Sequence, residues 1–246
     1  MTMIKKIEDS LQNFEDSFIS RRFLPVASLL LIICFLMSAF IIAPTEIVEG
    51  DVQRIFYFHL PAALASYLCF AITCLFSIFF LWRKKQIYTH WAKASALVGV
   101  IFTIACLWSG MAWGKPIWGV WWTWDARLTS TLILLFLYTG YLLIHSLDPF
   151  SEGRIARLAS VVGIISFLDI PLINMSVRWW RTLHPQPIVL APLNENRLPS
   201  DMFAVLLISI FAIILFAIWL ISINARIFKN EFLINMLSKK ISAGSD

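Results

Sequence analysis

Two histidines, His59 and His184, are the side chains of this 246-residue sequence whose type and surroundings best suit ligand chemistry. Each lies among aromatic residues and close to a proline, in the runs YFHLP and RWWRTLHP. Neutral imidazole is a standard axial ligand of haem iron, and two loops that approach a flat macrocycle from opposite sides would supply one ligand each. Taken alone, each histidine is more simply explained as a solvated or hydrogen-bonded residue near a helix end.

A dense group of tryptophans lies between these histidines in the sequence. Gly114, Pro116 and Gly119 are interspersed with them and predict an irregular loop. Anchoring at a membrane interface needs about one or two tryptophans per helix end. A flat apolar ligand that stacks on aromatic faces would explain the excess, and an unusually rich aromatic belt would explain it as well. The group holds five of the chain's 11 tryptophans within 12 positions: Trp113, Trp118, Trp121, Trp122 and Trp124.

Charged residues follow the tryptophans and recur in the neighbouring polar segments. We expect Asp125 to cap the next helix and so to fix the direction in which the chain leaves the loop. A salt bridge from Asp125 to Arg127 is not expected, because residues two apart on a helix do not face each other. Five basic residues are candidates for pairing with haem propionates or with lipid headgroups: Arg54, Lys115, Arg127, Arg178 and Arg181.

The composition is that of an integral membrane protein. Hydrophobic residues make up 59% of the chain and charged residues 14%, against about 25% charged residues in soluble domains. The net charge of +5 therefore reports membrane orientation and does not indicate nucleic-acid binding. No nucleotide-binding motif is present, so any ATP hydrolysis must belong to a partner. Four cysteines without a paired motif are expected to be small buried residues: Cys34, Cys69, Cys74 and Cys106.

Apolar runs predict one all-α membrane domain over residues 1–246, a bundle of six transmembrane helices. A polar segment, 1–22, precedes the first helix, and the tryptophan-rich loop is expected at 113–127. Asp169 lies within the fifth predicted helix beside Pro171, where it is either a functional carboxylate or part of a polar kink. The six predicted spans are 23–42, 61–82, 94–112, 128–146, 158–177 and 202–223.

The distribution of basic residues predicts the orientation of these helices. Of the 20 Lys and Arg residues, 14 fall on the side of the two termini and six on the side of the tryptophan loop. By the positive-inside rule, both termini are cytoplasmic and the tryptophan loop faces outward. His59 and His184 then lie outside, whereas His90 and His145 lie inside.

The run WGVWWTWD at residues 118–125 resembles the WGxxWxWD signature of tryptophan-rich haem-handling proteins. Together with six spans and the two flanking histidines, it makes the chain similar to the haem exporter protein C family of the bacterial cytochrome c maturation system. The resemblance implies a protein of the bacterial inner membrane, not an enzyme, that holds haem b at the periplasmic face with His59 and His184 as axial ligands. It implies haem contacts from Trp113, Trp118, Gly119, Trp121, Trp122, Trp124, Asp125 and Arg127.

The resemblance also implies protein partners. Haem would be presented to a membrane-anchored periplasmic haem chaperone, and the complex would include ATP-binding-cassette subunits and a small single-span helper protein, within membrane lipid. Three other functions remain open. A transmembrane haem transporter would be expected to show internal repeats, which the two halves lack. A haem–cytochrome c ligase of the related proteins would be larger, and a simple scaffold would bind no pigment.

Overall fold

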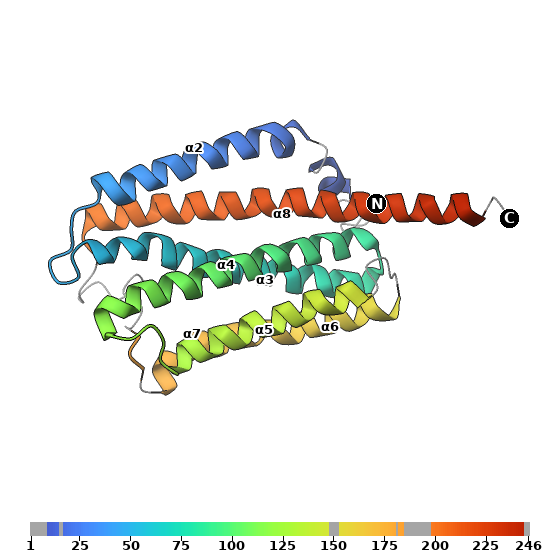
Figure 1. The fold of residues 1–246 in the computed structure, drawn as a ribbon. Coiled ribbons are helices and arrows are strands. Elements are labelled where there is room, and N and C mark those ends of the chain that lie inside the picture. The colour runs from blue at the N-terminus through green and yellow to red at the C-terminus, as the bar shows by residue number, and fades with distance from the viewer. Residues whose placement is uncertain (1–8, 15–16, 148–152, 181, 185–197, 244–246) are drawn as a thin grey trace.

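Six helices long and apolar enough to cross a membrane run side by side in the computed structural model (Figure 1). The structure describes residues 9–14, 17–147, 153–180, 182–184 and 198–243. Within these residues there is no β-strand, only an isolated bridge between Glu46 and Gly50. The all-α fold and the number of spans are therefore confirmed. The elements are η1 (Ile19–Phe23), α2 (Leu24–Met37), η2 (Ser38–Ile42), η3 (Asp51–Ile55), α3 (Phe56–Arg83), α4 (Gln86–Trp118), α5 (Ala126–Leu147), α6 (Arg154–Phe167), α7 (Asp169–Trp179) and α8 (Ser200–Ala243).

Helices α3 and α4 form the centre of the bundle. The long helix α8 packs on them and on α2, while α5, α6 and α7 cover the other side (Figure 1). The outward face of α2 is apolar, with Leu29 and Leu30 exposed, as expected for a helix that faces lipid. Cys34 lies exposed on this helix, so the expectation that every cysteine is buried is wrong for this residue.

Small residues let the central helices approach closely. A Cβ atom on Gly99 of α4 would lie 2.5 Å from the Phe70 ring of α3. The Phe70 ring in turn stacks on Tyr138 of α5 with centroids 3.7 Å apart. The Tyr138 hydroxyl donates a hydrogen bond to the carbonyl of Gly163 on α6, at 3.1 Å. This chain of contacts ties α5 and α6 to the centre.

The predicted break of the third span at Gly114 and Pro116 is wrong. Helix α4 continues through both residues to Trp118. Pro116 lies in the last turn, where its missing N–H removes a single hydrogen bond. Gly119 caps the helix: its φ of 78° is the left-handed conformation of a C-terminal glycine, and its N–H donates to the Lys115 carbonyl. The true loop is 119–125, shorter than the predicted 113–127, and Trp113 and Trp118 lie on the helix.

The fifth span consists of two helices. Leu168 separates α6 from α7, and its N–H bonds to the carbonyl of Ile165, three residues back. Asp169 begins α7 and Pro171 falls in its first turn, where proline is tolerated. The Asp169 side chain is 9% exposed, and its Oδ2 has no hydrogen-bond partner among the described residues. The helix is interrupted here by the single residue Leu168, whose φ of −65° and ψ of −16° stay in the right-handed helical region, so Asp169 lies at an interruption within one span.

Helix α8 is much longer than its predicted span. Its 44 residues correspond to about 66 Å, roughly twice the thickness of the hydrocarbon core. Its C-terminal part therefore extends out of the membrane, and Figure 1 shows it projecting beyond the bundle.

The loops of the bundle separate into two groups. The α2–α3 and α4–α5 connections lie at one end together with the described residues 182–184 that follow α7 (Figure 1). The turn between α3 and α4 and the C-terminal end of α8 lie at the other (Figure 1). His59, His184 and the tryptophan loop are thereby brought to the same end of the molecule.

Candidate ligand-binding site

His59 lies in the first turns of α3 and faces α4. Its Nδ1 lies 3.0 Å from the carbonyl oxygen of Cys106 and 3.1 Å from the Ser109 hydroxyl. The Ser109 hydroxyl itself donates to the Cys106 carbonyl, at 3.0 Å. Because a carbonyl only accepts, the proton of the neutral ring lies on Nδ1, and the Nε2 lone pair remains for a metal. Histidine ligands of metals are commonly oriented in this way.

Trp113 packs against the His59 ring and is itself held by Glu49. The Trp113 ring lies edge-on to the His59 ring, with centroids 5.8 Å apart. The Trp113 Nε1 donates to Glu49 Oε2 of the α2–α3 loop, at 2.9 Å. Trp113 therefore supports His59 from α4 instead of belonging to an open tryptophan loop. Neither Glu49 nor Cys106 stood out in the sequence, because both act through contacts with residues far away in the chain.

Gly110 leaves room for the His59 ring, which allows a specific prediction. A Cβ atom at Gly110 would lie 3.0 Å from His59 Cε1, whereas one at Gly140 of α5 would meet nothing within 4 Å. Replacing a helical glycine by alanine stabilises by up to about 1 kcal/mol where there is space. We expect Gly140→Ala to raise the unfolding temperature in detergent and to leave the haem spectrum unchanged. Gly110→Ala should give a lower unfolding temperature than Gly140→Ala and should shift the haem spectrum. The same response from both variants would contradict the close contact.

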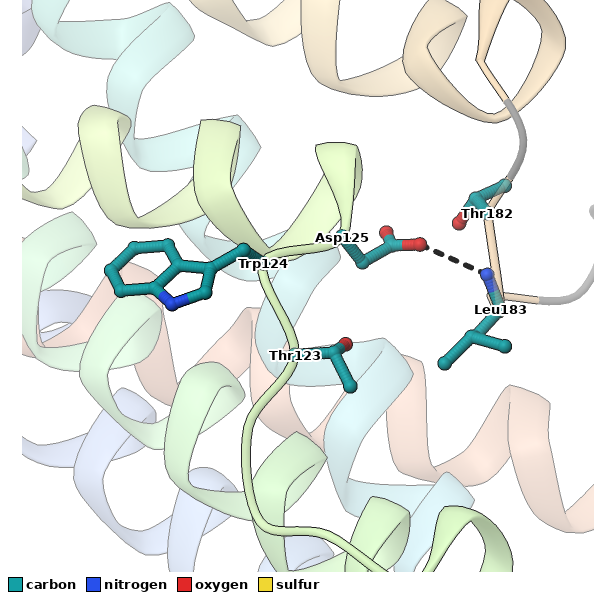
Figure 2. A pocket seen from close by; sticks show the side chains of 5 residues that line it. All are labelled: Thr123, Trp124, Asp125, Thr182 and Leu183. Atoms are coloured by element: carbon teal, nitrogen blue, oxygen red, sulfur yellow. Dashed lines mark hydrogen bonds between the residues drawn. The ribbon is translucent and has the colours of Figure 1, made fainter.

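Asp125 joins the tryptophan loop to the segment 182–184. Its Oδ1 accepts the N–H of Arg127, and its Oδ2 accepts the N–H of Leu183, both at 2.9 Å. The first bond confirms the predicted helix cap. Figure 2 shows the carboxylate pointing at Leu183 and the Trp124 ring pointing the opposite way. An open cavity of about 300 Å³ lies here, lined by Thr123, Trp124, Asp125, Thr182 and Leu183 (Figure 2).

The hydrogen bonds that Asp125 accepts are strongest when its carboxylate is ionised, so its contribution to stability should depend on pH. Partial burial favours a higher pKa, but hydrogen bonds from Thr182, Arg127 and Leu183 and the neighbouring His184 hold the pKa of Asp125 below its ordinary value. The stabilisation is therefore full above the unfolded-state pKa of about 3.9 and disappears as the pH falls through the lower folded-state pKa.

We expect Asp125→Ala to destabilise the protein by about 1 kcal/mol at neutral pH and by progressively less as the pH falls below the unfolded-state pKa of about 3.9, measured by thermal unfolding in detergent. The neighbouring variant Thr123→Ala serves as the control, since its effect should not vary with pH. An Asp125→Ala effect that stays the same size throughout an acid titration would contradict this role.

His184 contacts Arg127 directly. The Arg127 Nη1 lies 3.1 Å from His184 Nδ1, and the His184 N–H donates to the Thr182 hydroxyl at 3.0 Å. As expected, the Arg127 guanidinium does not pair with the Asp125 carboxylate, which holds its backbone N–H instead. His184 and Arg127 both lie within electrostatic range of His59, so the two predicted iron ligands and one cation share the same end of the bundle.

The tryptophans of the loop divide by exposure. Trp121 is 59% exposed and Trp124 is 78% exposed. Trp122 lies between them, perpendicular to Trp124 at 5.8 Å, and its Nε1 is buried without a hydrogen-bond partner among the described residues. Trp118 instead folds back along α4, where a Cβ atom on Gly114 would lie 2.9 Å from its ring. The loop therefore presents two open aromatic faces and one orphaned donor.

The other basic candidates differ in their freedom to bind a ligand. Arg54 of η3 is held by bonds to the Ala39 carbonyl of η2 at 2.7 Å and to Asp51 at 3.0 Å. Lys115 donates to the Gly119 carbonyl at 2.8 Å. Arg178 is exposed at the end of α7, and Arg181 lies outside the described residues. Arg127 alone of the described candidates contacts a predicted ligand.

The two remaining histidines lie within the other half of the bundle and are buried. His90 is 9% exposed and packs near Phe232 of α8, and His145 is 4% exposed and packs edge-on to Tyr141. Neither belongs to the group around His59.

The residues at the loop end match the requirements of haem. Haem supplies its own equatorial nitrogens and needs only axial ligands, apolar surface for its ring and partners for its carboxylates. His59 offers the lone pair of Nε2, the loop offers open indole faces, and Arg127 offers a cation. The fold and these residues define a polytopic membrane protein with a candidate site for a large, flat, acidic ligand at one end of its bundle.

Comparison with known proteins identifies the family. Residues 10–237 match the family model of heme exporter protein C. The chain is 39% identical over 189 residues to heme exporter protein C of Haemophilus influenzae, covering 75% of this chain and 74% of that protein. It is 39% identical over 165 residues to heme exporter protein C of Escherichia coli K12, covering 65% of each. It is 37% identical over 193 residues to a ccmC-like mitochondrial protein of cytochrome c biosynthesis from Marchantia polymorpha, covering 76% and 79%. The chain belongs to the heme exporter protein C family.

Proposed function

We propose that this protein holds haem b at the periplasmic face of a bacterial inner membrane and delivers it to a membrane-anchored haem chaperone. Membership of the heme exporter protein C family supports a role in haem handling for cytochrome c biogenesis. The observation that carries the proposal is His59, whose Nδ1 is hydrogen-bonded to the Cys106 carbonyl, so that the Nε2 lone pair would be left to bind iron. His184 would supply the second iron ligand from a segment whose Leu183 N–H donates to Asp125 of the tryptophan loop.

The chain's own residues position the ligand and perform no bond-making step. Trp121, Trp122 and Trp124 offer aromatic surface, and Arg127 offers a cation for a propionate. Trp113, Trp118 and Gly119 shape the support beneath the loop. ATP-binding-cassette subunits and a small single-span helper protein would complete the complex, because the chain has no nucleotide-binding motif of its own.

The distribution of basic residues supports the outward orientation of the site. In the sequence, 14 of the 20 Lys and Arg residues fall in the segments predicted to lie on the side opposite the tryptophan loop. The positive-inside rule makes that end cytoplasmic, with both termini.

Reporter fusions test this orientation. A periplasm-active reporter placed after Trp124 or after His184 should be active, and one placed after Lys85 should be inactive. A cytoplasm-active reporter should give the reverse pattern. A cytoplasmic signal from a fusion after either Trp124 or His184 would place the site on the wrong side and contradict the proposal.

Delivery itself is tested with the full chain and a tagged chaperone produced together. Covalently haem-loaded chaperone should accumulate with the wild type and fall to background with His59→Ala or His184→Ala. Wild-type loading by both variants, at equal membrane abundance, would overturn the proposal.

One observation favours transport as a second candidate. The break between α6 and α7 places a buried carboxylate, Asp169, inside a span, and discontinuous helices with such groups line the pathways of many transporters. Haem flux into vesicles that contain this chain alone would favour transport. Retention of haem at the outer end without flux would favour presentation.

A further inference from the structure

We propose that Arg127 is a latch that keeps His184 from binding iron until a carboxylate of the ligand draws the guanidinium away. This inference rests on the proposed function, in which His59 and His184 ligate the same iron. It concerns the ligand-free state, in which the two histidines have different hydrogen-bond partners.

The partners of the two rings are of opposite kinds. His59 Nδ1 faces an acceptor, the Cys106 carbonyl, at 3.0 Å. His184 Nδ1 faces a donor, the Arg127 guanidinium, at 3.1 Å. Arginine has no acceptor and keeps its proton, so the Nδ1 of His184 must supply the lone pair. The single proton of the neutral His184 ring then lies on Nε2.

Neither nitrogen of His184 is ready for a metal in this arrangement. Nδ1 is occupied by the hydrogen bond from Arg127, and Nε2 carries the proton. His59 has the reverse tautomer, with a lone pair on Nε2. In the ligand-free state, His59 therefore has a nitrogen lone pair available for iron, whereas His184 does not.

Neighbouring residues hold both Arg127 and the segment that carries His184. Asp125 fixes the Arg127 backbone through Oδ1 and the Leu183 backbone, next to His184, through Oδ2. The Arg127 side chain also hydrogen-bonds Tyr67 of α3. The contact between Arg127 and His184 thus joins two anchored segments that are 57 residues apart in the chain.

A carboxylate of the ligand would open this contact, because a guanidinium binds a carboxylate more strongly than a neutral imidazole. Once Arg127 has turned to the carboxylate, Nδ1 can take a proton from water while Nε2 gives one to water. The net charge of the ring does not change, and the Nε2 lone pair becomes available. The site would then be selective for metalloporphyrins that carry free acid groups.

Ferric haem and its dimethyl ester, titrated into the purified full chain, distinguish a latch from a simple propionate anchor. In the wild type, haem should give a six-coordinate low-spin spectrum, and the ester should leave His184 unbound and the iron high-spin. Arg127→Met removes the latch, so we expect it to bind the ester in the low-spin form, about tenfold or more tighter than the wild type does. Arg178→Met, which removes an exposed arginine of the same end, should not improve ester binding.

Equal binding of the ester by the wild type and Arg127→Met would show that Arg127 is only an anchor and would overturn the latch. A second measurement needs neither a variant nor haem. Ring ¹⁵N chemical shifts of His184 in the ligand-free wild type should show the proton on Nε2, and a proton on Nδ1 would also overturn the latch. Failure of the proposed function would give a different result. The spectrum of bound haem would then be independent of His184 in every variant, and the latch would be ruled out as well.

Discussion

Replacing either His59 or His184 by alanine should convert the haem spectrum of the purified protein from six-coordinate low-spin to high-spin. Each variant removes one of two imidazole ligands, and we expect haem affinity to fall on the order of tenfold or more. Added imidazole should restore the low-spin spectrum by filling the vacated position. The measurement is absorbance spectroscopy of wild type and variants, with and without imidazole.

His90 and His145 provide the controls for this experiment. Both are buried away from the tryptophan loop, so their replacement should lower stability without altering the spectrum of the folded protein. Unchanged spectra in His59→Ala and His184→Ala, with loss of haem in His90→Ala or His145→Ala, would move the site to the other end of the bundle.

A triple replacement of Trp121, Trp122 and Trp124 by alanine should strongly weaken haem retention while the protein still inserts into the membrane. Each stacked ring contributes about 1 kcal/mol beyond its burial, so losing three should weaken binding roughly a hundredfold. Haem content after purification and dissociation during dilution measure the effect.

Trp82 and Trp108 test whether any exposed tryptophan would have the same effect. Their side chains are 66% and 67% exposed, and they lie on α3 and α4 outside the loop. Their joint replacement should leave haem retention unchanged. If the triple variant retained haem and loaded the chaperone like the wild type, only the aromatic-belt interpretation of the loop would remain.

The pattern of apolar runs predicted the spans, and the spans in turn grouped the loops correctly. Both predictions depend on local composition over about 20 residues, which is the information that a bilayer imposes on a sequence. The cap made by Asp125 was predicted for the same reason, since capping is local. The position of Pro116 inside α4 was not predicted, because a proline in the last turn costs little and leaves no distinct pattern.

The support of His59 lay beyond sequence reasoning, because its partner Cys106 is 47 residues away and contributes only a carbonyl. Gly110 carried a usable signal, as a glycine inside an apolar helix often marks a close approach. The contact between Arg127 and His184 had no signal in the sequence, because the sequence shows two polar residues and not the hydrogen bond between them.

The ligation of one iron by His59 and His184 is tested most directly by low-temperature electron paramagnetic resonance of the ferric, haem-loaded full chain. Two imidazole ligands should give a low-spin signal, which should be lost on His184→Ala and regained on addition of imidazole. A high-spin signal in the wild type, or a low-spin signal that persists in both His59→Ala and His184→Ala, would contradict the account.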